Sequence, residues 1–264
     1  YLTAGAAASL TVSLNAILNA EDEVILLAPF FPEYRVFVER AGGRVRIVQP
    51  DPETFLPDFE ALEAAIGDRT RALILNSPNN PSGAILSEDG LRRLCGILDA
   101  AEKRYGHPVW LLSDEPYREL VWDGSRIPFV TQYYGNSLVL YSYSKSLSLP
   151  GERIGYILVS SRAQNAKGIY EAICGAGRAL GFVCAPSLLQ HMLPACAGLC
   201  ADFSVYRTNR ALLYEGLTAL GFEAALRRPH RGGLHLRQAA GRVLPFPACA
   251  RTRCQALCGT GEGT

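Results

Sequence analysis

The chain has 264 residues, of which 48% are hydrophobic and 19% are charged, and its formal net charge is +1. This length and composition allow one large domain with a hydrophobic core and part of a second domain. No apolar run approaches the ~20 residues of a membrane-spanning helix, and no signal peptide opens the chain. We therefore expect a soluble, cytoplasmic protein with no membrane partner.

Charge is distributed unevenly along the chain. Residues 227–264 contain seven arginines, no lysine and one acidic residue, a net charge of +6, whereas the rest of the chain carries −5. A basic tail of this kind is one pattern that binds nucleic acid. The eight cysteines form no Cys-x-x-Cys pair, and Cys196 and Cys200 lack a histidine partner. Buried thiols are therefore expected rather than a metal site.

Short apolar runs alternate with helix-like segments along the first 160 residues. The predicted elements there are a helix over 6–19, a strand over 24–28, a helix over 32–41, a strand over 45–48, a helix over 58–66, a strand over 72–75, a helix over 87–105, and strands over 109–112, 138–141 and 156–159. Further helices are predicted over 164–180, 186–197 and 201–220. This order predicts the α/β class, with a mainly parallel sheet and helices on both faces.

Residues with useful chemistry follow three of the predicted strands. The strand over 72–75 leads to Asn80, the strand over 109–112 leads to Asp114, and the strand over 138–141 leads to Lys145. Each segment alone has a structural explanation, such as a turn or a helix cap. Ligands of open α/β sheets bind beyond the carboxyl ends of the strands, so we expect the three segments to form one site.

Lys145 is one of only three lysines among 26 basic residues. Its place just after a buried strand is poorly solvated, and desolvation lowers the pKa of an ammonium group. The free amine can then form a Schiff base with a carbonyl. The alternative is a lysine at a strand end that simply reaches water.

The start of the chain is made of small residues that lead into the first predicted helix. Gly5, Ala6 and Ala7 would let a phosphate approach the backbone N–H groups at the helix N-terminus. A phosphate site, an amine, a carboxylate and a phenol together are what pyridoxal 5′-phosphate requires. Asp114 suits the acid that lies opposite the pyridine nitrogen of this cofactor.

Other polar side chains would complete such a site. Arg153 and Ser142 would bind the phosphate, and Tyr117 and Asn80 would hydrogen-bond the phenolic oxygen of the ring. Phe31 would stack on the ring, with ordinary core packing as the alternative.

In these motifs the chain resembles the class I and II aminotransferases, pyridoxal phosphate-dependent enzymes of fold type I similar to aspartate aminotransferase. The motifs are Asn-Pro-Ser-Gly at 80–83, Asp-x-x-Tyr at 114–117, and Ser-x-Ser-Lys at 142–145 with Arg153 eight residues on. Their order and spacing agree from residue 2 to about 226. The resemblance implies that Lys145 forms the aldimine with the cofactor and is the general base.

The resemblance also implies the remaining roles. Asp114 and Tyr117 join Lys145 as catalytic residues, and Asn80 also contacts the substrate carboxylate. The Asn80–Pro81 bond is expected to be cis. The cofactor-binding residues are Gly5, Ala6, Ala7, Phe31, Asn80, Asp114, Tyr117, Ser142, Ser144, Lys145 and Arg153. The expected partners are an amino acid, a 2-oxo acid and a second copy of the parent chain as a homodimer, with no metal and no nucleic acid.

Two departures from the family set limits on these expectations. The chain starts at the phosphate loop, which predicts that an N-terminal arm is missing. After Phe222 the sequence loses the apolar strand pair of the family, and its Arg-rich tail suggests a reading-frame shift near residues 228–233. A genuine nucleic-acid-binding tail is the alternative. No residue of the tail matches the family's arginine for the substrate α-carboxylate, which leaves open whether this fragment is active.

The expected organisation is a large cofactor-binding domain over 1–195 and the beginning of a small α+β domain over 196–264, with 227–264 not native to the fold. A carbon–sulfur β-lyase or an amino-acid synthase on the same scaffold is one alternative function. A non-catalytic ligand sensor of the same fold is another.

Overall fold

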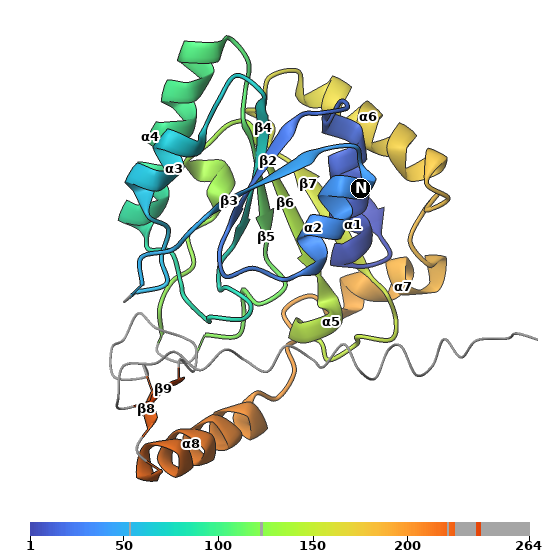
Figure 1. Cartoon of the computed structure of the whole chain (residues 1–264). Helices are drawn as coiled ribbons and strands as arrows, with labels where there is room; N and C mark the ends of the chain where they lie inside the picture. The colour runs from blue at the N-terminus through green and yellow to red at the C-terminus, as the bar shows by residue number, and fades with distance from the viewer. Residues whose placement is uncertain (53, 122–123, 221, 225–235, 239–264) are drawn as a thin grey trace, which may run out of the picture.

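The computed structural model describes residues 1–52, 54–121, 124–220, 222–224 and 236–238. A seven-stranded sheet in the order β1-β7-β6-β5-β4-β2-β3 forms its centre (Figure 1). Its strands are β1 (Leu2–Thr3), β2 (Glu23–Leu27), β3 (Arg44–Val48), β4 (Thr70–Asn76), β5 (Trp110–Asp114), β6 (Ser137–Ser142) and β7 (Gly155–Val159). A separate pair of short strands, β8 (Phe222–Ala224) and β9 (Leu236–Gln238), is antiparallel.

The helices follow the predicted order. They are α1 (Ala6–Ile17), α2 (Glu33–Arg40), α3 (Phe59–Ala65), α4 (Glu88–Tyr105), α5 (Tyr143–Ser146), α6 (Ala166–Ala179), α7 (Ser187–Met192) and α8 (Ser204–Ala219), with short 3-10 helices η1 (Val130–Gln132) and η2 (Leu193–Cys196). Strand β1 and helix α5 were not predicted, because they are too short to show a periodicity. The helix predicted over 186–197 is divided into α7 and η2, because Pro194 lacks the N–H that a continuous helix needs.

The predicted fold class is confirmed. Strands β2 to β6 pair in parallel, whereas β7 is antiparallel to both β6 and β1. Successive side chains of β4 point to opposite faces, so Leu73 and Leu75 enter one hydrophobic cluster and Ala72 and Ile74 enter the other. Helices α3 and α4 cover the first face, and α1, α2 and α6 cover the second (Figure 1).

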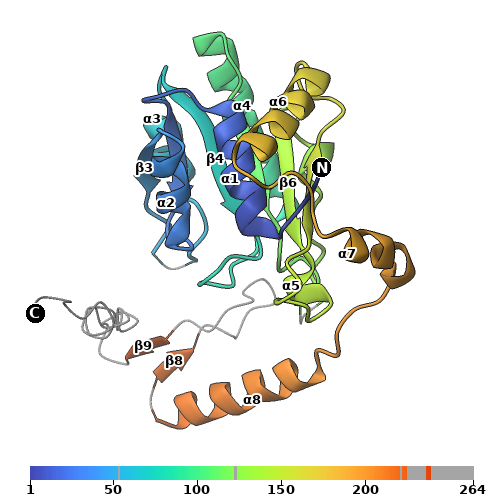
Figure 2. The ribbon, with the colours of Figure 1, turned by 90° about the vertical axis from the view of Figure 1, so that its right-hand side faces the viewer.

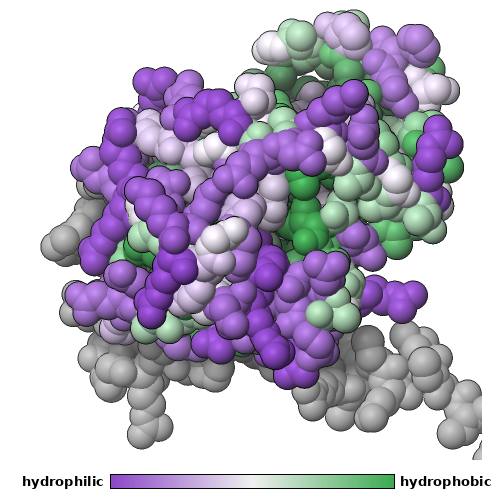
Figure 3. Space-filling model, turned by 90° about the horizontal axis from the view of Figure 1, so that it is seen from above, coloured by the Kyte–Doolittle hydropathy of each residue, from purple (hydrophilic) through white to green (hydrophobic). Residues whose placement is uncertain are grey.

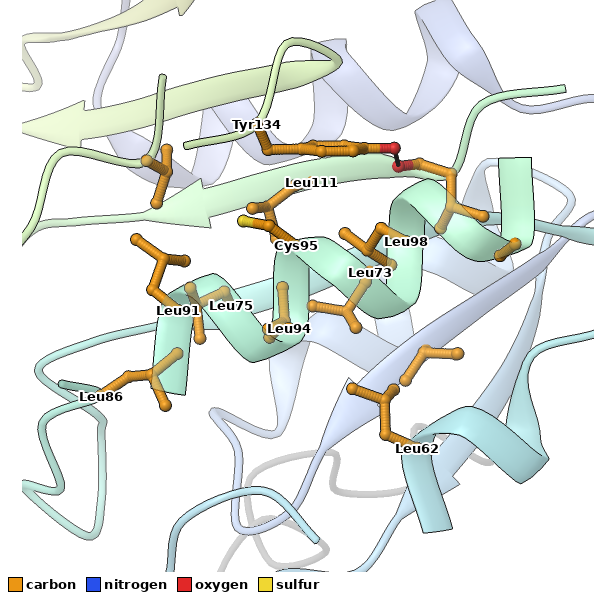
Figure 4. Close-up of a cluster of buried hydrophobic side chains, with 14 of the residues drawn as sticks. Leu62, Leu73, Leu75, Leu86, Leu91, Leu94, Cys95, Leu98, Leu111 and Tyr134 are labelled. Atoms are coloured by element: carbon orange, nitrogen blue, oxygen red, sulfur yellow. Dashed lines mark hydrogen bonds between the residues drawn. The ribbon is translucent and has the colours of Figure 1, made fainter. Parts of the chain in front are cut away.

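Helix α4 shows how the spacing of apolar residues produces a helix that covers one face of the sheet. Leu91, Leu94 and Leu98 recur at helical spacing and are buried against the sheet (Figure 4). Ser87 caps the start of this helix, because its Oγ accepts a hydrogen bond from the Gly90 N–H at 3.1 Å. In the same cluster the hydroxyl of Tyr134 donates to the carbonyl oxygen of Val109, which satisfies its polar end (Figure 4).

The parallel strands place their carboxyl ends at one edge of the sheet, where α5 also lies (Figures 1 and 2). Figure 3 views the opposite end of the molecule, where hydrophilic residues cover much of the surface and hydrophobic residues gather at the centre and toward one side. No helix in the described part of the chain is long and apolar enough to cross a membrane. The predicted domain boundary near residue 195 stays a prediction, and the predicted frame shift near 228–233 lies outside the described residues.

Candidate active site

The ends of β4, β5 and β6 lie side by side. Asn76, the last residue of β4, pairs in register with Asp114, the last residue of β5, and Asp114 pairs with Leu140 of β6. The Glu115 N–H continues this register by donating to the Leu140 carbonyl oxygen at 2.8 Å. The motifs that follow these strands therefore begin at one edge of the sheet, as the sequence predicted.

Asn76 joins two of these motifs through its side chain. Its Nδ2 donates to the Asp114 carbonyl oxygen at 2.8 Å, and its Oδ1 accepts from the Asn80 N–H at 2.7 Å. The Asn80–Pro81 bond is cis, which confirms that prediction. Asn76 was not predicted to have this role, although the sequence places it at the end of a strand.

Asp114 is buried, and its two carboxylate oxygens differ. Oδ2 accepts a hydrogen bond from the hydroxyl of Tyr34, whereas Oδ1 has no hydrogen-bond partner among the described residues. Burial raises the pKa of Asp114 to about 7, the Tyr34 hydrogen bond opposes this rise, and the charge of Glu115 adds to it. Tyr34 was not predicted to belong to the site.

Glu115 is the second buried carboxylate at this strand end, but its side chain is fully paired. It accepts hydrogen bonds from the Ser113 hydroxyl at 2.7 Å and from the Arg118 Nε at 2.6 Å. Asp114 thus keeps an unpartnered oxygen whereas its neighbour does not, so Asp114 is the acid available to a ligand.

Tyr117 and Asn80 are brought together, as predicted. Burial raises the pKa of the Tyr117 hydroxyl, Asp114 raises it further, and a side-chain hydrogen bond with Asn80 opposes the rise. Phe31 packs edge-on against Tyr34, with ring centroids 5.7 Å apart and planes at 78°. This contact matches the core-packing alternative for Phe31, and stacking on a cofactor stays a prediction.

The phosphate site predicted at the chain start has a defined geometry. Gly5 caps α1 with φ 89° and ψ 174°, a conformation nearly restricted to glycine. A Cβ on Gly5 would lie 2.8 Å from Nη2 of Arg153. The guanidinium therefore lies against the first turn of α1, which starts with Ala6 and Ala7. Gly155 permits this approach, because its own Cβ would lie 3.1 Å from Gly5 Cα.

The segment after β6 carries the serines and the lysine. Ser142 is buried, caps α5, and shares a 2.8 Å hydrogen bond between its Oγ and that of Ser144. Lys145 lies in α5 with an exposed side chain that makes no hydrogen bond or ion pair with the described residues. The expected desolvation of Lys145 is therefore wrong for this chain, because the short helix carries it past the end of the buried strand.

Comparison with known proteins places these motifs in a family. A sequence model of the family described as aminotransferase class I and II matches residues 1–226, the range over which the resemblance was predicted. A probable aspartate/prephenate aminotransferase of Thermus aquaticus is 32% identical over 231 residues, covering 84% of this chain and 57% of that protein. A probable kynurenine–oxoglutarate transaminase of Saccharomyces cerevisiae is 34% identical over 217 residues, covering 76% and 45%.

A solved structure gives the same result for the fold. The crystal structure of an aminotransferase from Eubacterium rectale superposes with a TM-score of 0.85 at 52% identity, covering 89% of this chain and 58% of that one. The chain thus spans about half the length of the relatives that it matches.

Proposed function

Because the chain belongs to the class I and II aminotransferases, we propose that it forms the cofactor-binding part of a pyridoxal phosphate-dependent enzyme. That enzyme would move an amino group between an amino acid and a 2-oxo acid. When bound, the cofactor's protonated pyridine ring draws electrons from the substrate carbon that loses a proton. The described residues match the three chemical ends of this cofactor.

The observation that carries the proposal is the unpartnered Oδ1 of Asp114. A buried carboxylate oxygen with no hydrogen-bond donor is costly unless a ligand supplies one. A protonated ring nitrogen is such a donor, and its charge would also offset the burial of the carboxylate. Asp114 would hold the proton of that nitrogen in place.

Other described groups suit the other two ends of the cofactor. The first turn of α1 and the Arg153 guanidinium combine backbone N–H groups with a positive charge, which suits the phosphate. Ser142 and Ser144 would add hydroxyl donors. Tyr117 and Asn80, already joined to each other, would hold the phenolic oxygen of the ring.

Lys145 would hold the cofactor through its amine and move a proton between the substrate Cα and the cofactor C4′. Its exposure in this chain suggests that other protein parts cover it in the working enzyme, and we propose a homodimer of the longer parent chain for that role. The relatives are named for different substrates, so the proposed substrates are amino acids and 2-oxo acids in general.

The chain's low lysine content allows a sharp test. The protein is incubated with pyridoxal phosphate, treated with borohydride to fix the cofactor to the amine that holds it, and digested for mass spectrometry. We expect the added mass on the peptide of Lys145 and its loss in Lys145→Ala. Lys103→Ala and Lys167→Ala are matched controls that should retain the label. A label spread over all three lysines, or none, would refute the proposal.

A further inference from the structure

We propose that Tyr34 is a positioning residue that holds Asp114 through Oδ2, favours its ionised form and leaves Oδ1 free for the N–H of a bound ligand. The ligand in question rests on the proposed function, whereas the link between Tyr34 and Asp114 is a property of the chain itself. The two residues lie 80 positions apart, at the first turn of α2 and at the end of β5.

The geometry restricts what Tyr34 can do. Its side chain is 2% exposed and packs in the hydrophobic cluster on the α1 and α2 side of the sheet. Among the described residues, its hydroxyl donates a hydrogen bond only to Oδ2 of Asp114. Burial and the charge of Asp114 raise the pKa of Tyr34 well above its ordinary value, so the phenol keeps its proton and remains a donor.

This single donor matters because the other groups around Asp114 act against its charge. Burial raises the pKa of Asp114 first, and the neighbouring Glu115 raises it further, whereas the Tyr34 hydrogen bond lowers it. Tyr117 is the second phenol that interacts with Asp114, and it bonds instead to Asn80. Tyr34 is therefore the group that opposes this rise and favours the ionised carboxylate, which is the form that a cationic nitrogen needs as its partner.

The fixed side of the carboxylate has a second consequence. Asn76 holds the backbone of Asp114 through its carbonyl oxygen, and Tyr34 holds the side chain through Oδ2. With both attachments made, Oδ1 is the carboxylate oxygen that is left without a partner among the described residues. Removing the hydroxyl of Tyr34 would release the carboxylate to rotate as well as change its charge.

The test uses the protein without cofactor, so its outcome is separate from the proposed function. The pKa of the Asp114 carboxyl is followed by NMR of 13C-labelled aspartate, assigned through Asp114→Asn, in the wild type and in Tyr34→Phe. We expect Tyr34→Phe to raise this pKa by about one to two pH units, because a hydrogen bond to a charged group stabilises it by a factor of roughly ten to one hundred. The ring of Tyr34 is retained, so its packing is retained too.

Tyr134→Phe is the matched control. Tyr134 is similarly buried at 1% exposure, and its hydroxyl also donates a hydrogen bond, to the Val109 carbonyl oxygen, but it lies in the cluster on the other face of the sheet. A general effect of losing a buried hydroxyl would appear in both variants. We expect Tyr134→Phe to leave the Asp114 pKa unchanged while lowering stability.

A second substitution at position 34 keeps the test decisive if Tyr34→Phe folds poorly. 3-Fluorotyrosine placed at position 34 is a stronger donor, and we expect it to lower the Asp114 pKa. An unchanged Asp114 pKa in a folded Tyr34→Phe protein or with 3-fluorotyrosine would overturn the role of Tyr34. Failure of pyridoxal phosphate to bind, with the pKa changes as expected, would instead remove the proposed function alone.

Discussion

The guanidinium of Arg153 lies directly against Gly5, so close that a Cβ on Gly5 would come within 2.8 Å of Nη2. Two segments almost 150 residues apart thus form one positively charged corner, made of a helix N-terminus and an arginine. The corner exists because β1 pairs with β7, which places Thr3 opposite Gly155 and carries Gly5 to the arginine.

Gly5→Ala tests whether this corner binds phosphate. The new methyl group would displace Arg153, and the backbone at φ 89° would be strained, so we expect a loss of about 1–3 kcal/mol in unfolding free energy. We also expect affinity for pyridoxal phosphate to fall at least about tenfold, with little change for pyridoxal, which has no phosphate. Calorimetric titration with both ligands measures the difference.

Gly106→Ala is the control for this substitution. Gly106 also has a positive φ, of 75°, but a Cβ there would meet no atom within 4 Å. The Gly106→Ala protein should lose about 1 kcal/mol of unfolding free energy, because of the backbone conformation alone, and should keep its affinity for pyridoxal phosphate. Equal affinities in wild type and Gly5→Ala would show that the corner is not the phosphate site.

Asn76→Ala tests the link between the two motifs that follow β4 and β5. The change leaves the Asp114 carbonyl oxygen and the Asn80 N–H without their partner, so we expect about 2 kcal/mol less unfolding free energy in urea. Because Asn80 and Asp114 both belong to the proposed cofactor site, pyridoxal phosphate affinity should fall too. Asn136→Ala is the matched control, since the Asn136 side chain also bridges two partners, Glu102 and the Gln164 N–H. The Asn136→Ala protein should lose a similar amount of unfolding free energy while its affinity for pyridoxal phosphate stays unchanged. Identical affinities in the two variants would contradict the role of Asn76.

Asp114→Asn tests the pH dependence of stability without cofactor. The folded-state pKa of about 7 lies above the ordinary value of 3.8, so the folded protein binds a proton that the unfolded chain has released. Stability from Asp114 is therefore present below about pH 4 and is lost as pH rises to about 7, by on the order of 4 kcal/mol. Between pH 4 and pH 8, the unfolding free energy of the Asp114→Asn protein should therefore fall by less than that of the wild type. Parallel pH profiles of the two proteins in chemical denaturation would refute this expectation.

Most elements were predictable because their signals are local. The leucines of α4 recur at helical spacing, Ser87 caps that helix, and the apolar run of β4 ends at a turn rich in asparagine and proline. The predicted site residues also belong to short motifs, so their order along the chain was readable. Strand β1 and helix α5 were missed, because two and four residues carry no periodicity.

The amino-acid sequence by itself determined the order of helices and strands, the motifs at the strand ends and the family, since each depends on residues that are near neighbours in the chain. Only the tertiary structure decided that Tyr34 binds Asp114, that Arg153 lies on Gly5 and that Lys145 is exposed. These relationships depend on strand register and on how helices pack over the sheet, which bring together residues far apart in the chain. Local periodicity carries no information about such distances.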